Sequence, residues 1–254
     1  MKIKVIDQIK QQVERGRKAI AFLIDPDDLN DQELRLVLNH AIENKVDFLF
    51  VGGSLVTSDR MSFVVNLIKS STQIPCVIFP GNAMQVDGNA DAILFLSLIS
   101  GRNPELLIGQ HVIAAPVLKR SKLEVLSTGY LLINSGKPTS ASYISNSIPI
   151  PNDKPSIAAS TALAGEMLGM ALMYLDAGSG AEAPVSAKVI RAVRAAVACP
   201  LIVGGGITTL NKAREAFNAG ADIVVVGNGA QKNLAFLNEV SELVHLLNEP
   251  LNVN

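Results

Sequence analysis

Short apolar runs alternate along the chain with segments in which apolar residues recur every three or four positions. The runs are typical of strands buried on both faces, and the recurring positions are typical of amphipathic helices. We expect strands at residues 18–25, 46–51, 76–79, 92–97, 130–134, 171–175, 201–203 and 222–226. We expect helices at residues 3–14, 31–44, 61–69, 104–110, 156–169, 186–198, 210–219 and 234–247. This alternation predicts a parallel sheet with crossover connections.

The length of the chain suits one closed barrel. It has 254 residues, and a (β/α)8 (TIM) barrel typically has about 250. Hydrophobic residues make up 48% of the sequence, which is enough for a sizeable core. We therefore expect residues 1–254 to form a single α/β domain with a (β/α)8-barrel fold.

The connection between the third and fourth expected strands is irregular. Residues 80–91 are few and include Pro80, Gly81, Asn82 and Gly88. A segment so rich in turn-forming residues does not hold an ordinary crossover helix. We expect a modified barrel in which the third helix is replaced by non-helical chain, and this would leave one side open for a groove that takes a long apolar ligand.

A second irregular segment covers residues 135–155 and is rich in Ser, Pro, Asn and Lys. It is long for a loop between a strand and the following helix. Its position inside the barrel pattern favours a substrate-covering loop over a domain linker. A tolerated surface insertion is the alternative.

Three glycine-rich turns follow the last three expected strands. They are residues 174–180, the run Gly204-Gly205-Gly206, and the pair Gly227 and Gly229 around Asn228. Glycine lets backbone N–H groups approach an anion closely, and the start of the following helix adds a favourable dipole. Because loops after strands seven and eight form the usual phosphate site of such barrels, the chain is expected to bind a phosphorylated small molecule.

Two polar residues mark the ends of the first two strands. Asp25 ends the first strand and Ser54 follows the second. A carboxylate and a hydroxyl at neighbouring strand ends suit Mg²⁺, which takes few protein oxygens and completes its shell with water and phosphates. Asp25 could instead form a turn or a helix cap. We interpret Asp27 and Asp28 as caps for the following helix, with Asp27 also kept as a weaker candidate metal ligand.

Asp176 and Tyr174 lie at the end of the sixth strand. Asp176 stands between the strand and Ala177-Gly178-Ser179-Gly180, so its carboxylate is expected over the barrel mouth, where it could take a proton from a substrate hydroxyl. Tyr174 lies two residues earlier and points to the same side of the strand. It could orient the same substrate, or it could be a core tyrosine with a satisfied hydroxyl.

Composition excludes several other classes of function. The net charge is −1 and only 4% of residues are aromatic, which argues against nucleic acid as a partner. No apolar run reaches the roughly 18 residues that a membrane span needs, and the amino-terminal segment lacks the layout of a signal peptide. We expect a cytoplasmic protein.

Six motifs in order resemble the geranylgeranylglyceryl phosphate synthase family, which is related to the bacterial heptaprenylglyceryl phosphate synthases. The resemblance spans about residues 15–245. Its motifs are Phe22-Leu23-Ile24-Asp25-Pro26-Asp27, Val51-Gly52-Gly53-Ser54, Phe79-Pro80-Gly81-Asn82, Tyr174-Leu175-Asp176-Ala177-Gly178-Ser179-Gly180, Gly204-Gly205-Gly206-Ile207 and Gly227-Asn228-Gly229. Any one of them alone would be weak, but their shared order makes the resemblance specific.

The resemblance implies a Mg²⁺-dependent prenyltransferase that joins geranylgeranyl diphosphate to the 3-hydroxyl of sn-glycerol 1-phosphate, as a step of ether lipid biosynthesis. It places Mg²⁺ at Asp25 and Ser54. Glycerol phosphate would bind at Tyr174, Leu175, Asp176, Ala177, Gly178, Ser179, Gly180, Gly205, Gly206, Gly227 and Asn228. Asp176 would be the base, where the family more commonly has Glu.

Alternatives stay open at this point. The same chemistry could use a longer polyprenyl diphosphate, such as heptaprenyl diphosphate. A phosphosugar isomerase or lyase on the same barrel would need a catalytic lysine or an acid pair, and Lys119 and Lys137 are expected in loops. A non-catalytic sensor of a phosphorylated metabolite is a third possibility.

The chain is expected to form a homo-oligomer. Its mean hydropathy of +0.31 and the apolar helix expected at residues 156–169 predict exposed patches that other subunits would cover. The family resemblance points to a dimer or a hexamer.

Overall fold

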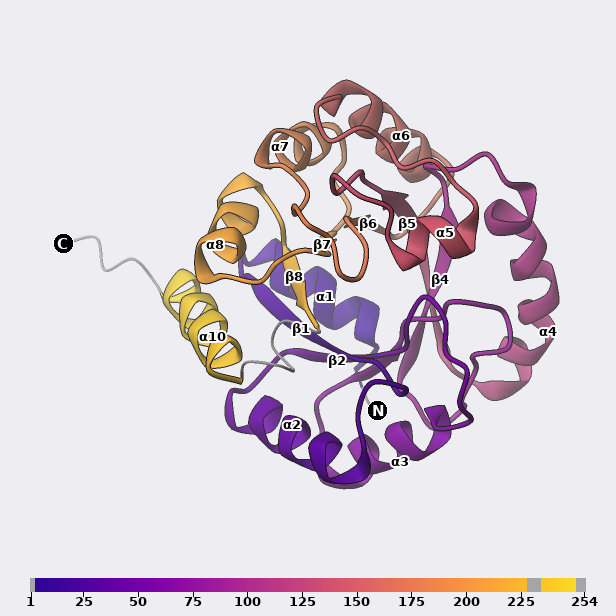
Figure 1. Cartoon of the computed structure of the whole chain (residues 1–254), viewed down its shortest axis with the longest axis vertical. Helices are drawn as coiled ribbons and strands as arrows, with labels where there is room; N and C mark the ends of the chain where they lie inside the picture. Colours follow the sequence, from indigo (N-terminus) through magenta and orange to yellow (C-terminus); the bar gives the residue numbers. More distant parts are fainter. Residues whose placement is uncertain (1–2, 228–233, 250–254) are drawn as a thin grey trace.

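Eight parallel strands close into a barrel in the order of the sequence, because β1 pairs with both β2 and β8 (Figure 1). The computed structural model describes residues 3–227 and 234–249. The strands are β1 (Ala19–Ile24), β2 (Phe48–Val51), β3 (Cys76–Ile78), β4 (Ala92–Leu98), β5 (Glu124–Leu132), β6 (Leu172–Asp176), β7 (Leu201–Gly204) and β8 (Ile223–Val226). The predicted fold class is confirmed.

Helices lie around this barrel, apart from the first helix, which lies across one end of it (Figure 1). They are α1 (Val5–Glu14), α2 (Asp31–Glu43), α3 (Met61–Ser71), α4 (Gln110–Ser121) with a preceding π-helical turn η1 (Glu105–Gly109), α5 (Ser140–Ser145), α6 (Pro155–Met167), α7 (Ala187–Ala196), α8 (Leu210–Ala219) and α10 (Leu234–Asn248). None of the helices within the described residues has the length and hydropathy of a membrane span.

The link between β3 and β4 has the predicted irregular form. Residues 79–91 run as turns and bends without a helix. The helix that follows the third strand of a regular barrel is therefore replaced here by non-helical chain, as the proline, glycine and asparagine content of this segment predicts.

Two predicted elements differ from the structure. β5 begins at Glu124, six residues before the predicted start at Tyr130. The prediction is late because Ser127, Thr128 and Gly129 interrupt the apolar run that marks a buried strand. The helix predicted to end at Gln110 continues as α4 to Ser121 although Pro116 lies inside it. The prediction that Lys119 lies in a loop is consequently wrong.

Alternate residues of the strands face two apolar layers. One fills the barrel interior and includes Phe48, Phe50 and Tyr174, and the other packs between the strands and the outer helices. α1 closes the interior at the amino-terminal end, because Val5 and Ile9 pack into the same interior layer. The barrel is thus sealed at one end, and ligands must enter at the carboxyl ends of the strands.

Aspartates directly before three strands tie the sealed end together. Asp47, Asp91 and Asp222 each accept a hydrogen bond from a backbone N–H of the preceding strand, at Ile20 (2.9 Å), Cys76 (2.8 Å) and Leu201 (2.9 Å). These bonds satisfy N–H groups at strand starts that would otherwise lie buried and unpaired.

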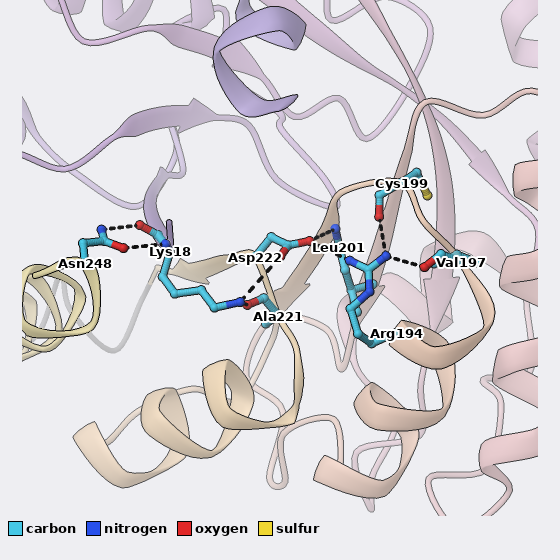
Figure 2. A network of polar contacts seen from close by, with 8 residues as sticks. All are labelled: Lys18, Arg194, Val197, Cys199, Leu201, Ala221, Asp222 and Asn248. Atoms are coloured by element: carbon cyan, nitrogen blue, oxygen red, sulfur yellow. Dashed lines mark hydrogen bonds and ion pairs between the residues drawn. The ribbon is translucent and has the colours of Figure 1, made fainter. Parts of the chain in front are cut away.

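The Asp222 carboxylate anchors the largest of these networks (Figure 2). It pairs with Arg194 Nη1 at 2.8 Å and with Lys18 Nζ at 3.5 Å. Asn248 at the end of α10 accepts from Lys18 N at 2.7 Å and donates to Lys18 O at 2.8 Å. The first strand, the last strand and the last helix are therefore held together far from the open end.

Candidate active site

A hollow that contains two carboxylates and many glycines lies where the loops after β1, β2, β6, β7 and β8 meet. Of the residues singled out in the sequence, those that line it are Asp25, Ser54, Tyr174, Asp176, Gly178, Ser179, Gly180, Gly205, Gly206 and Gly227. Leu175 and Ala177 are buried in the layer between strands and helices, so these two could serve the site only through their backbone. Asn228 lies outside the described residues.

Asp176 is a buried carboxylate at the end of β6, with 6% of its surface exposed. Its Oδ2 accepts a hydrogen bond from the Tyr130 hydroxyl at 2.5 Å, and its Oδ1 accepts one from Gly178 N at 2.7 Å. Burial raises the pKa of Asp176, and the bonds from Tyr130 and Gly178 act against this rise. A carboxylate with a raised pKa is a stronger base than an exposed one, which suits removal of a proton from a hydroxyl.

Tyr174 lies within the barrel interior and forms the floor of the hollow. Its ring stacks on Phe79 with centroids 5.3 Å apart and meets the Tyr130 ring edge-on at 5.5 Å. A side-chain carbon on Gly204 would come within 2.5 Å of the Tyr174 hydroxyl, so glycine leaves room for it. Burial raises the pKa of Tyr174 well above its usual value and keeps the hydroxyl protonated. Tyr174 is both a core residue and a lining residue of the hollow.

Tyr130 is a site residue that the sequence reasoning missed. Its hydroxyl is bonded to Asp176, and burial together with the Asp176 charge raises the pKa of Tyr130 well above its usual value. The prediction made Tyr130 the first residue of its strand and therefore placed it at the wrong end of the barrel. In the structure Tyr130 pairs directly with Tyr174 of β6, near the carboxyl end. Correct placement of the strand start would have revealed it.

Asp25 and Ser54, the residues predicted to hold Mg²⁺, both line the hollow. Asp25 Oδ1 accepts from Asp27 N at 3.0 Å, and its other oxygen lies so close to Gly53 that a side chain there would overlap it. Burial, with added repulsion from Asp28 and Asp27, raises the pKa of Asp25 to about 6. An oxygen-only pair of a half-buried carboxylate and a hydroxyl fits the preference of Mg²⁺.

Asp27 has a different place from the predicted helix cap. It accepts hydrogen bonds from the backbone and hydroxyl of Thr57 at 2.7 and 2.9 Å and from Ser58. These bonds lower the pKa of Asp27 to about 2. The cap of α2 is Asn30, which accepts from Gln32 N and Glu33 N. Asp27 therefore anchors the loop that follows Ser54.

The glycine loops after β6 and β7 touch each other beside Asp176. Gly205 has a φ of +79°, and a side chain on it would come within 2.5 Å of both Asp176 Oδ1 and Gly178 N. Lys212 on α8 donates to Gly206 O at 3.1 Å and to Thr208 Oγ1 at 3.2 Å. Glycine backbone with little side-chain bulk and the nearby Lys212 amino group make this side of the hollow suitable for a phosphate.

An apolar groove opens from the other side of the hollow, beside the non-helical segment 79–91. Its walls include Phe95 of β4, Ala114 and Leu118 of α4, and Ile144 of α5. The groove and the hollow share Gly53, Ser54 and Phe79. A groove thus lies on the side of the barrel that the missing helix leaves open.

Residues 135–155 line the groove and pack against the loop after β6. Ala141, Ile144 and Ser145 line the groove, and Thr139 packs so tightly on Gly178 that a side chain there would come within 2.5 Å of Thr139 Oγ1. This placement favours the covering loop over a surface insertion without a role.

A model of the PcrB family matches residues 11–244. The chain belongs to the PcrB family. Among its relatives, the geranylgeranylglyceryl phosphate synthase of Spirosoma linguale is 54% identical, and the match covers 92% of this chain and 94% of the relative. The synthase of the same name from Korarchaeum cryptofilum is 40% identical, and the match covers 92% of this chain and 98% of the relative.

Solved structures of this PcrB-family fold agree closely with the chain. The crystal structure of (S)-3-O-geranylgeranylglyceryl phosphate synthase from Thermoplasma acidophilum, in complex with the substrate sn-glycerol-1-phosphate, has a TM-score of 0.90 at 32% identity. That match covers 96% of this chain and 99% of the solved chain. The corresponding enzyme from Thermoplasma volcanium has a TM-score of 0.87 at 31% identity, with 95% and 98% covered.

Proposed function

We propose that this chain is a Mg²⁺-dependent prenyltransferase that joins geranylgeranyl diphosphate to the 3-hydroxyl of sn-glycerol 1-phosphate. The product is geranylgeranylglyceryl phosphate, an intermediate of ether lipid biosynthesis. The observation that carries the proposal is that the hollow with its carboxylates and glycine loops meets an apolar groove at Gly53, Ser54 and Phe79. A phosphorylated acceptor and a prenyl donor need two compartments of these kinds with a common edge.

The acceptor occupies the hollow in this proposal. Its phosphate binds at the loops around Gly178 and Gly205, where N–H groups and a helix start favour an anion. Its 3-hydroxyl lies at Asp176, which takes the proton. Tyr130 and Gly178 hold the two oxygens of this carboxylate, and so they fix the direction from which it can accept that proton.

The donor lies with its prenyl chain in the groove and its diphosphate at the junction. Asp25 and Ser54 would hold Mg²⁺, which supplies positive charge to the diphosphate and makes it a better leaving group. The allylic C–O bond breaks, the acceptor oxygen forms the new C–O bond, and inorganic diphosphate leaves. Phe79, Tyr130 and Tyr174 line this edge with aromatic rings and keep water from the reacting carbon.

A donor with twenty carbons is the proposed substrate, and heptaprenyl diphosphate is the longer alternative. The prenyl chain of either donor would lie against Ala114 and Leu118 of α4, which line the groove. The relatives above, all named for the geranylgeranyl product, support the shorter donor. Incubation with equal concentrations of geranylgeranyl and heptaprenyl diphosphate, followed by mass analysis of the lipid extract, tests this choice. Preferred transfer of the C35 chain would overturn the choice of donor, and the absence of any ether product would overturn the function.

An isomerase or lyase on the same barrel is less well supported. Such an enzyme needs a catalytic lysine or an acid pair at the hollow. Asp25 and Asp176 both line the hollow, so the carboxylates alone do not separate the two functions, and the lysines and the groove must decide. Lys119 lies on α4 outside the hollow, and the amino group of Lys212 is bonded to the glycine loop. The apolar groove has no use in the chemistry of a small phosphosugar, whereas the prenyl chain of a donor would lie in it.

A homo-oligomer, either a dimer or a hexamer, and a cytoplasmic location belong to the same proposal. Ile157, Met167 and Leu168 on or next to α6 are exposed, as are Val112 and Ile113 on α4. Neighbouring subunits would cover such residues. A monomer by light scattering at micromolar concentration would contradict the oligomer.

A further inference from the structure

Gln85 is a buried polar residue in the middle of the non-helical segment 79–91, with 8% of its surface exposed. Its Oε1 accepts a hydrogen bond from Gly81 N at 2.7 Å. Its Nε2 is buried and has no hydrogen-bond partner among the residues that the structure describes. Burying an unpaired donor costs stability, so a wholly apolar side chain would remove that cost. The hydrogen bond to Gly81 is therefore the contact that favours a glutamine over an apolar side chain at position 85.

Gly81 lies directly against the backbone of the loop after β2. A side-chain carbon on Gly81 would come within 2.9 Å of Ser54 O and would overlap Gly53 O. A side chain on Gly52 would likewise overlap Phe79 O. Because the two backbones touch without side chains between them, a shift of Gly81 must move Gly53 and Ser54.

Those two residues form the common edge of the hollow and the groove, and Gly53 packs on the Asp25 carboxylate. The phosphate side, with Gly178, Gly205 and Gly206, is built from β6 and β7 instead. A change at Gln85 therefore reaches the donor side of the site through Gly81 and leaves the acceptor side in place.

We propose that Gln85 is a positioning residue for the prenyl diphosphate, which acts by holding Gly81 against Gly53 and Ser54. Gln85 itself lines neither compartment. This inference rests on the proposed function for the identity of the donor. It assigns part of the donor affinity to a residue outside the site.

The test compares Gln85→Leu, which loses the acceptor oxygen, with Gln85→Glu, which keeps one. Equilibrium dissociation constants are measured separately for geranylgeranyl diphosphate with Mg²⁺ and for sn-glycerol 1-phosphate. Gln85→Leu should weaken the binding of the donor by roughly tenfold or more, because small misplacements of binding groups are costly. It should change the affinity for the acceptor by less than about twofold. Gln85→Glu should restore most of the donor affinity.

Asn89→Ala is the matched control. Asn89 lies on the same segment and donates to Asn66 Oδ1 at 3.1 Å, away from Gly81. It should leave the donor affinity unchanged, and thermal unfolding of all variants shows which of them are folded. Three results would overturn the inference: equal loss of affinity for both ligands in Gln85→Leu, an unchanged donor affinity in a folded Gln85→Leu protein, or a folded Gln85→Glu protein that binds the donor as weakly as Gln85→Leu.

These binding measurements do not depend on turnover. A wild-type protein that binds the donor but forms no ether would refute the proposed function while Gln85 is still judged by the donor affinity. A wild-type protein that does not bind the donor would refute both.

Discussion

The Tyr130 hydroxyl donates a 2.5 Å hydrogen bond to Asp176 Oδ2 across the boundary between the groove and the hollow. Tyr130 lines the groove and Asp176 lines the hollow. The proposed base is thus held by a residue that lines the groove proposed for the donor. A displacement of Tyr130 in the groove would therefore also displace the Asp176 carboxylate in the hollow.

Tyr130→Phe should lower kcat by at least about tenfold, because it removes the bond that orients the base. It should also move the acid limb of the pH profile. Asp176 works only when ionised, so activity falls as the pH drops through its pKa. Burial raises this pKa and the Tyr130 bond opposes the rise, so its loss raises the pKa further. The acid limb of the kcat/KM profile should therefore shift to higher pH, and a shift to lower pH would contradict the assignment.

Asp176→Asn should reduce turnover by roughly 10²-fold or more while glycerol phosphate still binds with similar affinity. The amide keeps the size of the carboxyl group but cannot take a proton. Steady-state kinetics together with calorimetric titration of the acceptor separate the two effects. Near-normal turnover would remove Asp176 from the mechanism.

Asp25→Ala should weaken the binding of the prenyl diphosphate by roughly tenfold or more, because only the donor would share Mg²⁺ with this carboxylate. The affinity for glycerol phosphate should stay nearly unchanged. Asp153→Asn is the control, since Asp153 is exposed and lines neither compartment. Titration of Mg²⁺ at fixed substrate provides the readout. If turnover of the wild type and Asp25→Ala is indifferent to Mg²⁺, the metal assignment is wrong.

Asp222→Ala should lower the free energy of unfolding by about 2–4 kcal/mol, because it breaks a largely buried network with Arg194 and leaves the Leu201 N–H unpaired (Figure 2). The network lies at the sealed end, so the KM values should stay close to those of the wild type. Asp153→Ala is the control: its pair with Lys154 is exposed and should matter by less than about 0.5 kcal/mol. Denaturant unfolding measures both, and equal losses in the two variants would contradict this account of Asp222.

Much of the fold could be predicted from local sequence patterns. Continuous apolar runs locate most strands, and the turn-forming residues Pro80, Gly81 and Asn82 reveal the missing helix. The glycine loops and Asp176 stand directly after strands, so their position at the open end follows from strand direction alone. Each of these features is determined by residues close to it in the sequence, so the sequence alone predicts it.

The remaining errors arise where distant contacts override the local pattern. Ser127, Thr128 and Gly129 continue β5 because both neighbouring strands supply ladder hydrogen bonds. That misplaced start concealed Tyr130. Asp27 was expected as a helix cap, yet Thr57 and Ser58, thirty residues later in sequence, bind it. No local signal indicates such partners.

Transfer of label from sn-glycerol 1-phosphate into an organic extract tests the central claim most directly. The reaction contains the wild-type chain, geranylgeranyl diphosphate and Mg²⁺, with Asp176→Asn and sn-glycerol 3-phosphate as controls. We predict an extractable product whose mass equals the acceptor plus one C20 prenyl group, with the ether on the 3-hydroxyl, and far less product in either control. A wild-type protein that binds both substrates and yields no extractable ether would contradict the account.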